Sequence, residues 1–167
     1  MSLDLTLRNR QQTRPVDIRL LRCVCTTLLT ELLPVDNVEL GVTLVAAPEM
    51  THINGEFLQH EGSTDVITFD YSEVADPNPQ TLNARVQLHG ELFVCLDEAV
   101  LQARRFRTTW QTELVRYIIH GTLHLLGHDD HHAPNRRKMK LEENRLLRVL
   151  GTRFALSRLA RKPRLRR

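Results

Sequence analysis

The distribution of apolar and polar residues along the chain predicts four β-strands. Residues 3–9 (LDLTLRN) alternate between the two types, as a strand does when only one of its faces is buried. Residues 64–71 (TDVITFDY) follow the turn-forming HEGS and are rich in β-branched and aromatic side chains, which favour strands. Together with residues 38–46 and 84–97, they predict a sheet of about four strands.

Apolar residues recur at helical spacing in the remaining stretches. Pro15 and Pro48 stand near the starts of the first two, where proline is tolerated because the first turn needs no backbone donor. Strands and helices are interspersed without a linker or repeat, so we expect an α+β fold: one layered domain over residues 1–152, with a mixed sheet covered by helices. The expected helices are residues 14–33, 47–58, 97–106, 109–126 and 134–150, and the expected loop is residues 72–83.

Length and composition also fit one compact domain. The chain has 167 residues, of which 41% are hydrophobic, enough for a substantial core. Its start is polar within a few positions, so we expect no signal peptide and no membrane span. Cys23, Cys25 and Cys95 lie in apolar stretches without the spacing of a zinc site. Reduced, buried thiols would suit a cytoplasmic protein.

Charge is spread unevenly along the chain. Residues 153–167 contain seven basic residues and no acidic one, which leaves residues 1–152 at −4 against +3 for the whole chain. A basic C-terminal tail of this kind is attracted to polyphosphate, because each neutralised phosphate releases counterions. The pattern suggests nucleic acid as a partner, although a solvated extension would have the same composition.

Five of the eight histidines lie between residues 118 and 132, in the segment IIHGTLHLLGHDDHH. His120 and His124 are four positions apart on a predicted helix, so both side chains leave one face and can converge on one divalent ion. Gly127 can end the helix in a left-handed conformation and turn the chain back toward that face. Asp130 would then supply a third ligand, and the fourth position would stay open for water, as in catalytic zinc sites.

The spacing of this pattern also resembles that of the metzincin proteases, but Gly121 argues against peptide hydrolysis. In those enzymes the residue after the first histidine is a glutamate that acts as general base. Phosphodiester cleavage tolerates the loss of that carboxylate better. A metal can act as Lewis acid, and the substrate phosphate or an RNA 2′-hydroxyl can share the proton transfer.

Three blocks of the sequence resemble the YbeY family of metal-dependent endoribonucleases. HGTLHLLGHDD (residues 120–130) is similar to the signature H-G-x-L-H-L-x-G-Y-D-H, STDVITFDY (63–71) to P-T-D-V-L-S-F-P, and HGELFVCLDEA (89–99) to the strand L-G-D-I-x-I. The blocks keep the family's order, and the resemblance covers roughly residues 35–150. It implies a single-strand-specific endoribonuclease in ribosomal RNA processing, including 3′-end maturation of the small-subunit RNA, and in ribosome quality control.

The chain departs from the family pattern at three positions. His128 replaces the signature tyrosine, and Asp130 stands where the signature has its third histidine. Aspartate can ligate zinc and favours hard ions more than imidazole does. We expect Asp130 as the third ligand because the downstream residues then keep the family's register, with His131 as the alternative if one residue is inserted. Leu58 replaces an arginine thought to meet RNA, and the candidates to substitute for it are Arg85, Arg104, Arg105 and Arg107.

Residues and resemblance together predict a zinc-dependent endoribonuclease. We expect one zinc ion held by His120, His124 and Asp130, with the two histidines as the catalytic pair. The expected partners are ribosomal RNA and the small ribosomal subunit, without a membrane or DNA. The alternative is a non-catalytic ribosome-assembly factor whose zinc is structural. Asp65 is expected to cap a local turn, to orient a ligating histidine or to be simply solvated.

Overall fold

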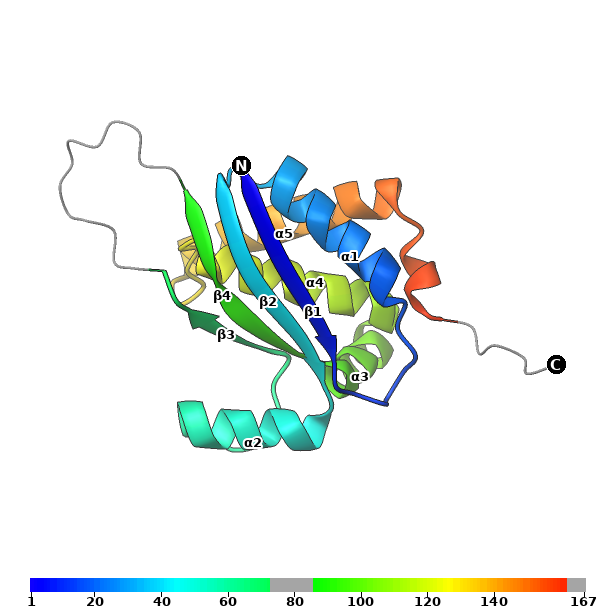
Figure 1. Ribbon diagram of the computed structural model, residues 1–167. Helices are drawn as coiled ribbons and strands as arrows, with labels where there is room; N and C mark the ends of the chain where they lie inside the picture. The colour runs from blue at the N-terminus through cyan, green and yellow to red at the C-terminus, as the bar shows by residue number, and fades with distance from the viewer. Residues whose placement is uncertain (73–85, 162–167) are drawn as a thin grey trace.

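The four strands form one mixed sheet in the order β1-β2-β4-β3. In the computed structural model, which describes residues 1–72 and 86–161, β1 and β4 run parallel to β2, and β3 runs antiparallel to β4 (Figure 1). The predicted four-stranded mixed sheet is therefore confirmed. The expected loop at residues 72–83 lies, beyond Ser72, outside the described residues. The strands are β1 (Ser2–Asn9), β2 (Asn37–Val45), β3 (Val66–Asp70) and β4 (Gln87–Cys95).

Helices cover one face of this sheet (Figure 1). α4 packs against β3 and β4, α1 packs against β1, and α3 and α5 each contact α4. α4 is thus the central helix, and it carries both of the singled-out histidines in its last turns. The α-helices are α1 (Ile18–Thr27), α2 (Ala47–Leu58), α3 (Leu96–Phe106), α4 (Trp110–Leu125) and α5 (Ala133–Arg153).

The first helix is shorter than the sequence predicts. It begins at Ile18 because the Asp17 carboxylate accepts a hydrogen bond from the Leu20 backbone N–H at 3.0 Å and so caps the helix. Val16 instead forms an isolated bridge with Ala160. The last part of the predicted helix is a π-helical turn (η1, Leu28–Leu32). The prediction missed these limits because the bridge depends on a residue far along the chain.

The main core lies between the helices and the covered face of the sheet. Leu40 and Leu92 of the central strands and Ile119 and Leu123 of α4 are at most 2% exposed. A smaller cluster, in which Met50 of α2 is fully buried, lies where α2 packs against one end of the sheet. The tight packing around α4 fixes the direction of its polar side chains.

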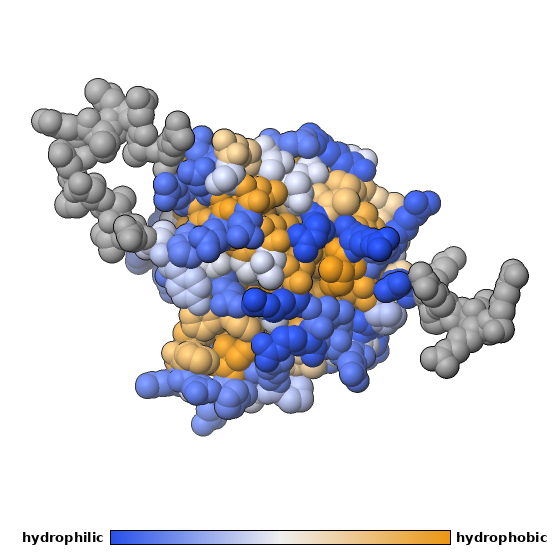
Figure 2. Space-filling view, viewed as in Figure 1, coloured by the Kyte–Doolittle hydropathy of each residue, from blue (hydrophilic) through white to orange (hydrophobic). Residues whose placement is uncertain are grey.

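The opposite face of the sheet is largely polar. Figure 2 shows hydrophilic side chains across its middle, with hydrophobic residues above and to the right of them as well as between β3 and α2. Polar contacts link the strands on this face: Arg8 of β1 pairs with Glu91 of β4 across β2 at 3.9 Å, and Nε2 of His89 lies 3.6 Å from the Glu39 carboxylate of β2. Among the helices in the described ranges, none combines the length and hydropathy that a membrane crossing requires.

Part of the expected basic tail packs against the body. A short 3-10 helix (η2, Leu156–Leu159) follows α5, and the Leu159 side chain is fully buried in the main core. The Leu159 carbonyl accepts a hydrogen bond from the Asp17 backbone at 2.8 Å, and Arg161 donates to the Pro15 carbonyl at 3.1 Å. Residues 154–161 therefore contribute to the core as well as to the basic charge, and residues 162–167 lie outside the described ranges.

Candidate metal centre

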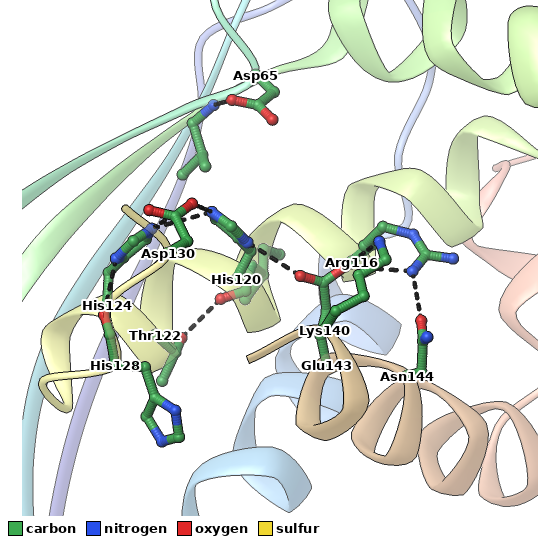
Figure 3. A network of polar contacts seen from close by, with 12 residues as sticks. Asp65, Arg116, His120, Thr122, His124, His128, Asp130, Lys140, Glu143 and Asn144 are labelled. Carbon is green, nitrogen blue, oxygen red and sulfur yellow. Dashed lines mark hydrogen bonds and ion pairs between the residues drawn. The ribbon is translucent and has the colours of Figure 1, made fainter. Parts of the chain in front are cut away.

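The C-terminal half of α4 lies close against the sheet. A Cβ atom on Gly121 would lie 2.9 Å from Cδ2 of Leu92 and 3.1 Å from Cγ2 of Val66, so a larger residue here requires the neighbours to move. The glutamate that a zinc protease carries at this position would displace these side chains. The close packing turns the neighbouring His120 away from the sheet and toward α5 (Figure 3).

Gly127 reverses the chain after α4, as the sequence predicts. It has φ +91, a left-handed conformation that favours glycine, and no other atom would crowd a Cβ there. Its N–H donates to the His124 carbonyl at 3.0 Å, and the His128 N–H donates to the Leu123 carbonyl at 3.0 Å. The reversal brings Asp130 back over the face of α4 that carries the two histidines (Figure 3).

Three donor atoms converge at the end of α4. The Nε2 atoms of His120 and His124 are 3.0 Å apart, and Oδ2 of Asp130 lies 3.7 Å from the first and 3.6 Å from the second. Donors about 2.0–2.2 Å from a tetrahedral zinc ion are roughly 3.3 Å from one another. The arrangement therefore has the size of a metal site, and its donor set of two imidazoles and one carboxylate suits a divalent ion.

His131, the alternative third donor, does not belong to this group. Its side chain is 84% exposed and lies 3.8 Å from Asp129. Asp129, Asp130 and His131 form a second group whose donor atoms lie within 4.8 Å, but it is more exposed than the first. The side chains of His120, His124 and Asp130 are only 26%, 28% and 34% exposed. Partial burial strengthens electrostatic binding, so the first group is the better candidate.

Each histidine of the group is oriented through its second ring nitrogen. Nδ1 of His124 lies 3.0 Å from the His128 carbonyl oxygen, and Nδ1 of His120 lies 2.9 Å from Oε2 of Glu143 (Figure 3). Both oxygens can only accept, so each Nδ1 donates and each Nε2 turns its lone pair toward Asp130. This is how the ligating histidines of metal sites are generally fixed.

Glu143 on α5 is the residue that sequence reasoning missed. Its side chain is only 4% exposed, and its Oε1 also accepts from Arg116 at 3.2 Å and Lys140 at 3.1 Å. Burial alone would raise the pKa of this carboxyl, but the hydrogen bonds from His120, Lys140 and Arg116 outweigh it and lower the pKa below its usual range. The same bond to Glu143 raises the pKa of His120, against the opposing effect of burial.

Asp65 does not hydrogen-bond to either histidine within the described ranges. Its Oδ1 accepts from the Val66 backbone N–H at 2.7 Å and from the Thr64 hydroxyl at 3.3 Å, which is local capping. Its negative charge nevertheless contributes to the raised pKa of His120. Of the roles considered for Asp65, the structure favours local capping. Glu143 is the residue that orients a histidine of the candidate site.

A cavity of about 760 Å³ adjoins two of the three donors. His120 and Asp130 line it together with four basic residues of α4 and α5: Arg116, Arg136, Arg137 and Lys140. Among the described residues, none of the arginines considered as substitutes for the family arginine lines this cavity. Arg104, Arg105 and Arg107 are exposed at the end of α3, and Leu58 is 41% exposed at the end of α2. Arg85 lies outside the described residues.

Fold and site together define a mixed α+β domain with a candidate metal centre at the end of its central helix, next to a cavity lined by both basic and acidic side chains. Residues 6–151 match the family model described as Endoribonuclease YbeY. The chain therefore belongs to the YbeY family, and the resemblance noted in the sequence is confirmed.

Individual relatives agree with the family match. The chain is similar to the Endoribonuclease YbeY of Chlorobium phaeovibrioides, 42% identical over 61% of this chain and 62% of the relative. It is 32% identical to the Endoribonuclease YbeY of Chlorobium luteolum over 89% of this chain and 98% of the relative. Among solved structures, TM1509 from Thermotoga maritima superposes with a TM-score of 0.65 at 22% identity, covering 98% of this chain and all of that one. That last similarity concerns the fold alone.

Proposed function

We propose that this chain is a zinc-dependent endoribonuclease that cleaves single-stranded RNA during ribosomal RNA processing. The family match and the relatives named as endoribonucleases support the nuclease role. The observation that carries the proposal is the convergence of His120, His124 and Asp130 beside a cavity that four arginine and lysine side chains help to line. We further propose that the protein acts in the cytoplasm on RNA of the small ribosomal subunit.

In this proposal one group of residues would hold the metal, and another would bind the RNA backbone. His120, His124 and Asp130 would hold one zinc ion, which when bound supplies Lewis-acid activation of water and of a phosphoryl oxygen. Glu143 keeps the His120 ring in the orientation that offers Nε2. Arg137 and Lys140 at the cavity would attract the RNA backbone, because arginine and lysine pair with phosphate.

The test measures metal content and RNA cleavage in the same preparations. The substrate is a structured ribosomal RNA fragment with single-stranded segments, compared with its fully paired form and with DNA of the same sequence. His120→Ala and His124→Ala should lose most bound metal and cleavage, because each removes one of three ligands. His52→Ala is the matched control, since His52 is 75% exposed on α2 and pairs only locally with Glu56.

The outcomes separate the function classes. Cleavage confined to single-stranded RNA and lost with the metal supports the proposal. Full metal content in both histidine variants would refute the ligand assignment. A wild-type protein that binds zinc, unfolds when zinc is removed and cleaves no RNA would be an assembly factor with a structural metal. A casein digest included as a further arm should show no cleavage, because position 121 holds glycine in place of the general base.

A further inference from the structure

The cavity next to the metal donors extends well beyond them. Its walls include Gln102 and Phe106 of α3 and Asn144 of α5, in addition to His120. Glu113, also at the cavity, precedes His120 by seven residues on α4, which is about 10 Å along the helix axis. The Thr108 hydroxyl, just after α3, donates a hydrogen bond to Glu113 at 2.7 Å. The α3 end of the cavity therefore lies about 10 Å from the metal donors.

An exposed aromatic ring stands at this far end. Phe106 is the last residue of α3, and 64% of it is exposed, whereas most large apolar side chains of the protein are buried. Arg105 lies over the ring, with its guanidinium carbon 5.7 Å from the centroid. An accessible aromatic ring beside basic groups is the feature on which unpaired bases stack in single-strand-binding proteins.

Two carboxamides line the cavity, Gln102 from α3 and Asn144 from α5. Asn144 accepts a hydrogen bond from Arg116 at 3.0 Å through Oδ1, which leaves its amide N–H groups to donate. Gln102 makes no side-chain hydrogen bond with any residue in the described ranges. A carboxamide offers both a donor and an acceptor, and these are the groups that pair with the edge of a base.

The charges of the cavity floor favour a neutral group over a phosphate. Four carboxylates (Asp65, Glu113, Asp130 and Glu143) and four cations (Arg116, Arg136, Arg137 and Lys140) line the cavity, so its charges balance. The carboxylates of Glu113 and Glu143 are paired with Arg116, and Glu143 is also paired with Lys140. Arg137 at the rim makes no ion pair with the described part of the chain. Phosphate therefore belongs at the rim, and an uncharged ring fits the interior.

We propose that this cavity, which we call the base cavity, holds one unpaired base of the RNA substrate next to the cleaved bond. The base stacks on Phe106, and its edge faces Gln102 and Asn144. This inference rests on the proposed function and specifies how that site chooses its substrate. A base in a duplex cannot enter the cavity, so the subsite itself would impose the requirement for single-stranded RNA.

An abasic scan combined with variants of Phe106 tests the proposal. A short single-stranded RNA that the protein cuts is prepared with one base removed at each position in turn, and kcat/KM is measured for the wild type and for Phe106→Ala. Stacking on an aromatic side chain corresponds to roughly 5- to 150-fold. One abasic position should lower wild-type kcat/KM by such a factor, and Phe106→Ala should lose a similar factor on intact RNA without a further loss at that position.

Matched variants separate stacking from structural damage. Leu101→Ala alters another exposed apolar residue of α3, 57% exposed and not in the cavity wall, and should behave as wild type. Phe106→Tyr should keep the activity, and Phe106→Leu should lose it. Gln102→Ala should change the relative rates among the four bases at the coupled position, whereas Phe106→Ala lowers all four rates together. If the loss caused by Phe106→Ala and the loss caused by removing a base multiplied at every position, the proposal would be overturned. A fully active Phe106→Ala would overturn it as well.

A binding measurement distinguishes failure of this proposal from failure of the proposed function. A short RNA that carries 2-aminopurine at the coupled position loses fluorescence when this base stacks on a protein ring. If the protein cleaves no RNA, the proposed nuclease function is refuted, and 2-aminopurine is then placed at every position in turn. Quenching at one position that Phe106→Ala abolishes would still support the base cavity. Cleavage without any position coupled to Phe106 would refute the base cavity and leave the nuclease in place.

Discussion

Replacing Glu143 with glutamine should weaken zinc binding without unfolding the protein. In the native site both oxygens of the Glu143 carboxylate accept hydrogen bonds. Oε2 accepts from His120 at 2.9 Å, and Oε1 accepts from Arg116 and Lys140. A glutamine has only one acceptor oxygen. If this oxygen faces His120, the amide N–H groups face two cations. If it faces the cations, His120 must carry its proton on Nε2, the atom that would bind the metal.

The expected size of the effect follows from this geometry. A hydrogen bond to a charged group contributes roughly 1.5–3 kcal/mol, and loss of a group that orients a metal-bound histidine typically costs about 10- to 100-fold in metal affinity. The two estimates agree, so we expect Glu143→Gln to raise the Kd for zinc by about 10- to 100-fold. The assay is competition for zinc against a chromophoric chelator, with thermal unfolding recorded in parallel.

Glu142→Gln provides the matched control. Glu142 is adjacent in sequence, but its side chain is 29% exposed and pairs with Arg145. This variant should bind zinc like the wild type. Wild-type affinity in Glu143→Gln would refute the orienting role of Glu143. Equal losses in both variants would show that any charge removed from α5 weakens the metal, and the argument from geometry would fail.

Acidification gives a second, independent readout of Glu143. Because its hydrogen bonds lower the pKa of this carboxyl, its contribution to stability is present above the ordinary pKa near 4.5 and is lost as pH falls through the lowered value. The free energy of unfolding of the wild-type protein, measured with denaturant below pH 5, should therefore fall more steeply with acid than that of Glu143→Gln. Parallel slopes would contradict the assignment.

Three further predictions concern other parts of the chain. Asp130→Ala should lower metal content far more than His131→Ala, measured by elemental analysis, and equal small losses would refute both as ligands. Truncation after Arg161 removes four basic residues but spares the buried η2 segment. It should weaken binding to all RNAs and flatten the slope of log K against log salt concentration by about 3. An unchanged slope would assign those residues to a solvated extension. Cys23, which is exposed, should react with iodoacetamide before Cys25, whose pKa burial raises to about 12; mass spectrometry showing early labelling of Cys25 would contradict its burial.

The sequence predicted the parts of the structure that depend on local pattern. The four strands follow from alternation and composition, and the reversal at Gly127 follows from the conformational freedom of glycine. His120 and His124 were found because two positions four apart on a helix share a face. Asp130, the third ligand that the sequence predicts, lies 3.6–3.7 Å from both in the structure, close enough for all three to contact one ion.

The features that the sequence did not reveal depend on contacts between distant segments. Glu143 meets His120 across 23 positions, and its only local signal is a carboxylate at helical spacing with the buried Met139, Leu146 and Leu150. The first half of the expected basic tail also packs because of contacts between distant segments. Leu159 is buried, and its backbone is hydrogen-bonded to Asp17 near the start of the chain. Charge composition identified a basic segment correctly but could not show that half of it packs.

The most direct test of the central claim is a zinc titration of metal-free protein that records bound metal and RNA cleavage together. If His120, His124 and Asp130 hold the one catalytic ion, cleavage of a single-stranded ribosomal RNA fragment should rise in proportion to bound zinc and level off at one equivalent. His124→Ala should show neither the binding nor the activity over the same range. Cleavage that is complete before zinc is added, or that is unchanged in His124→Ala, would contradict the account.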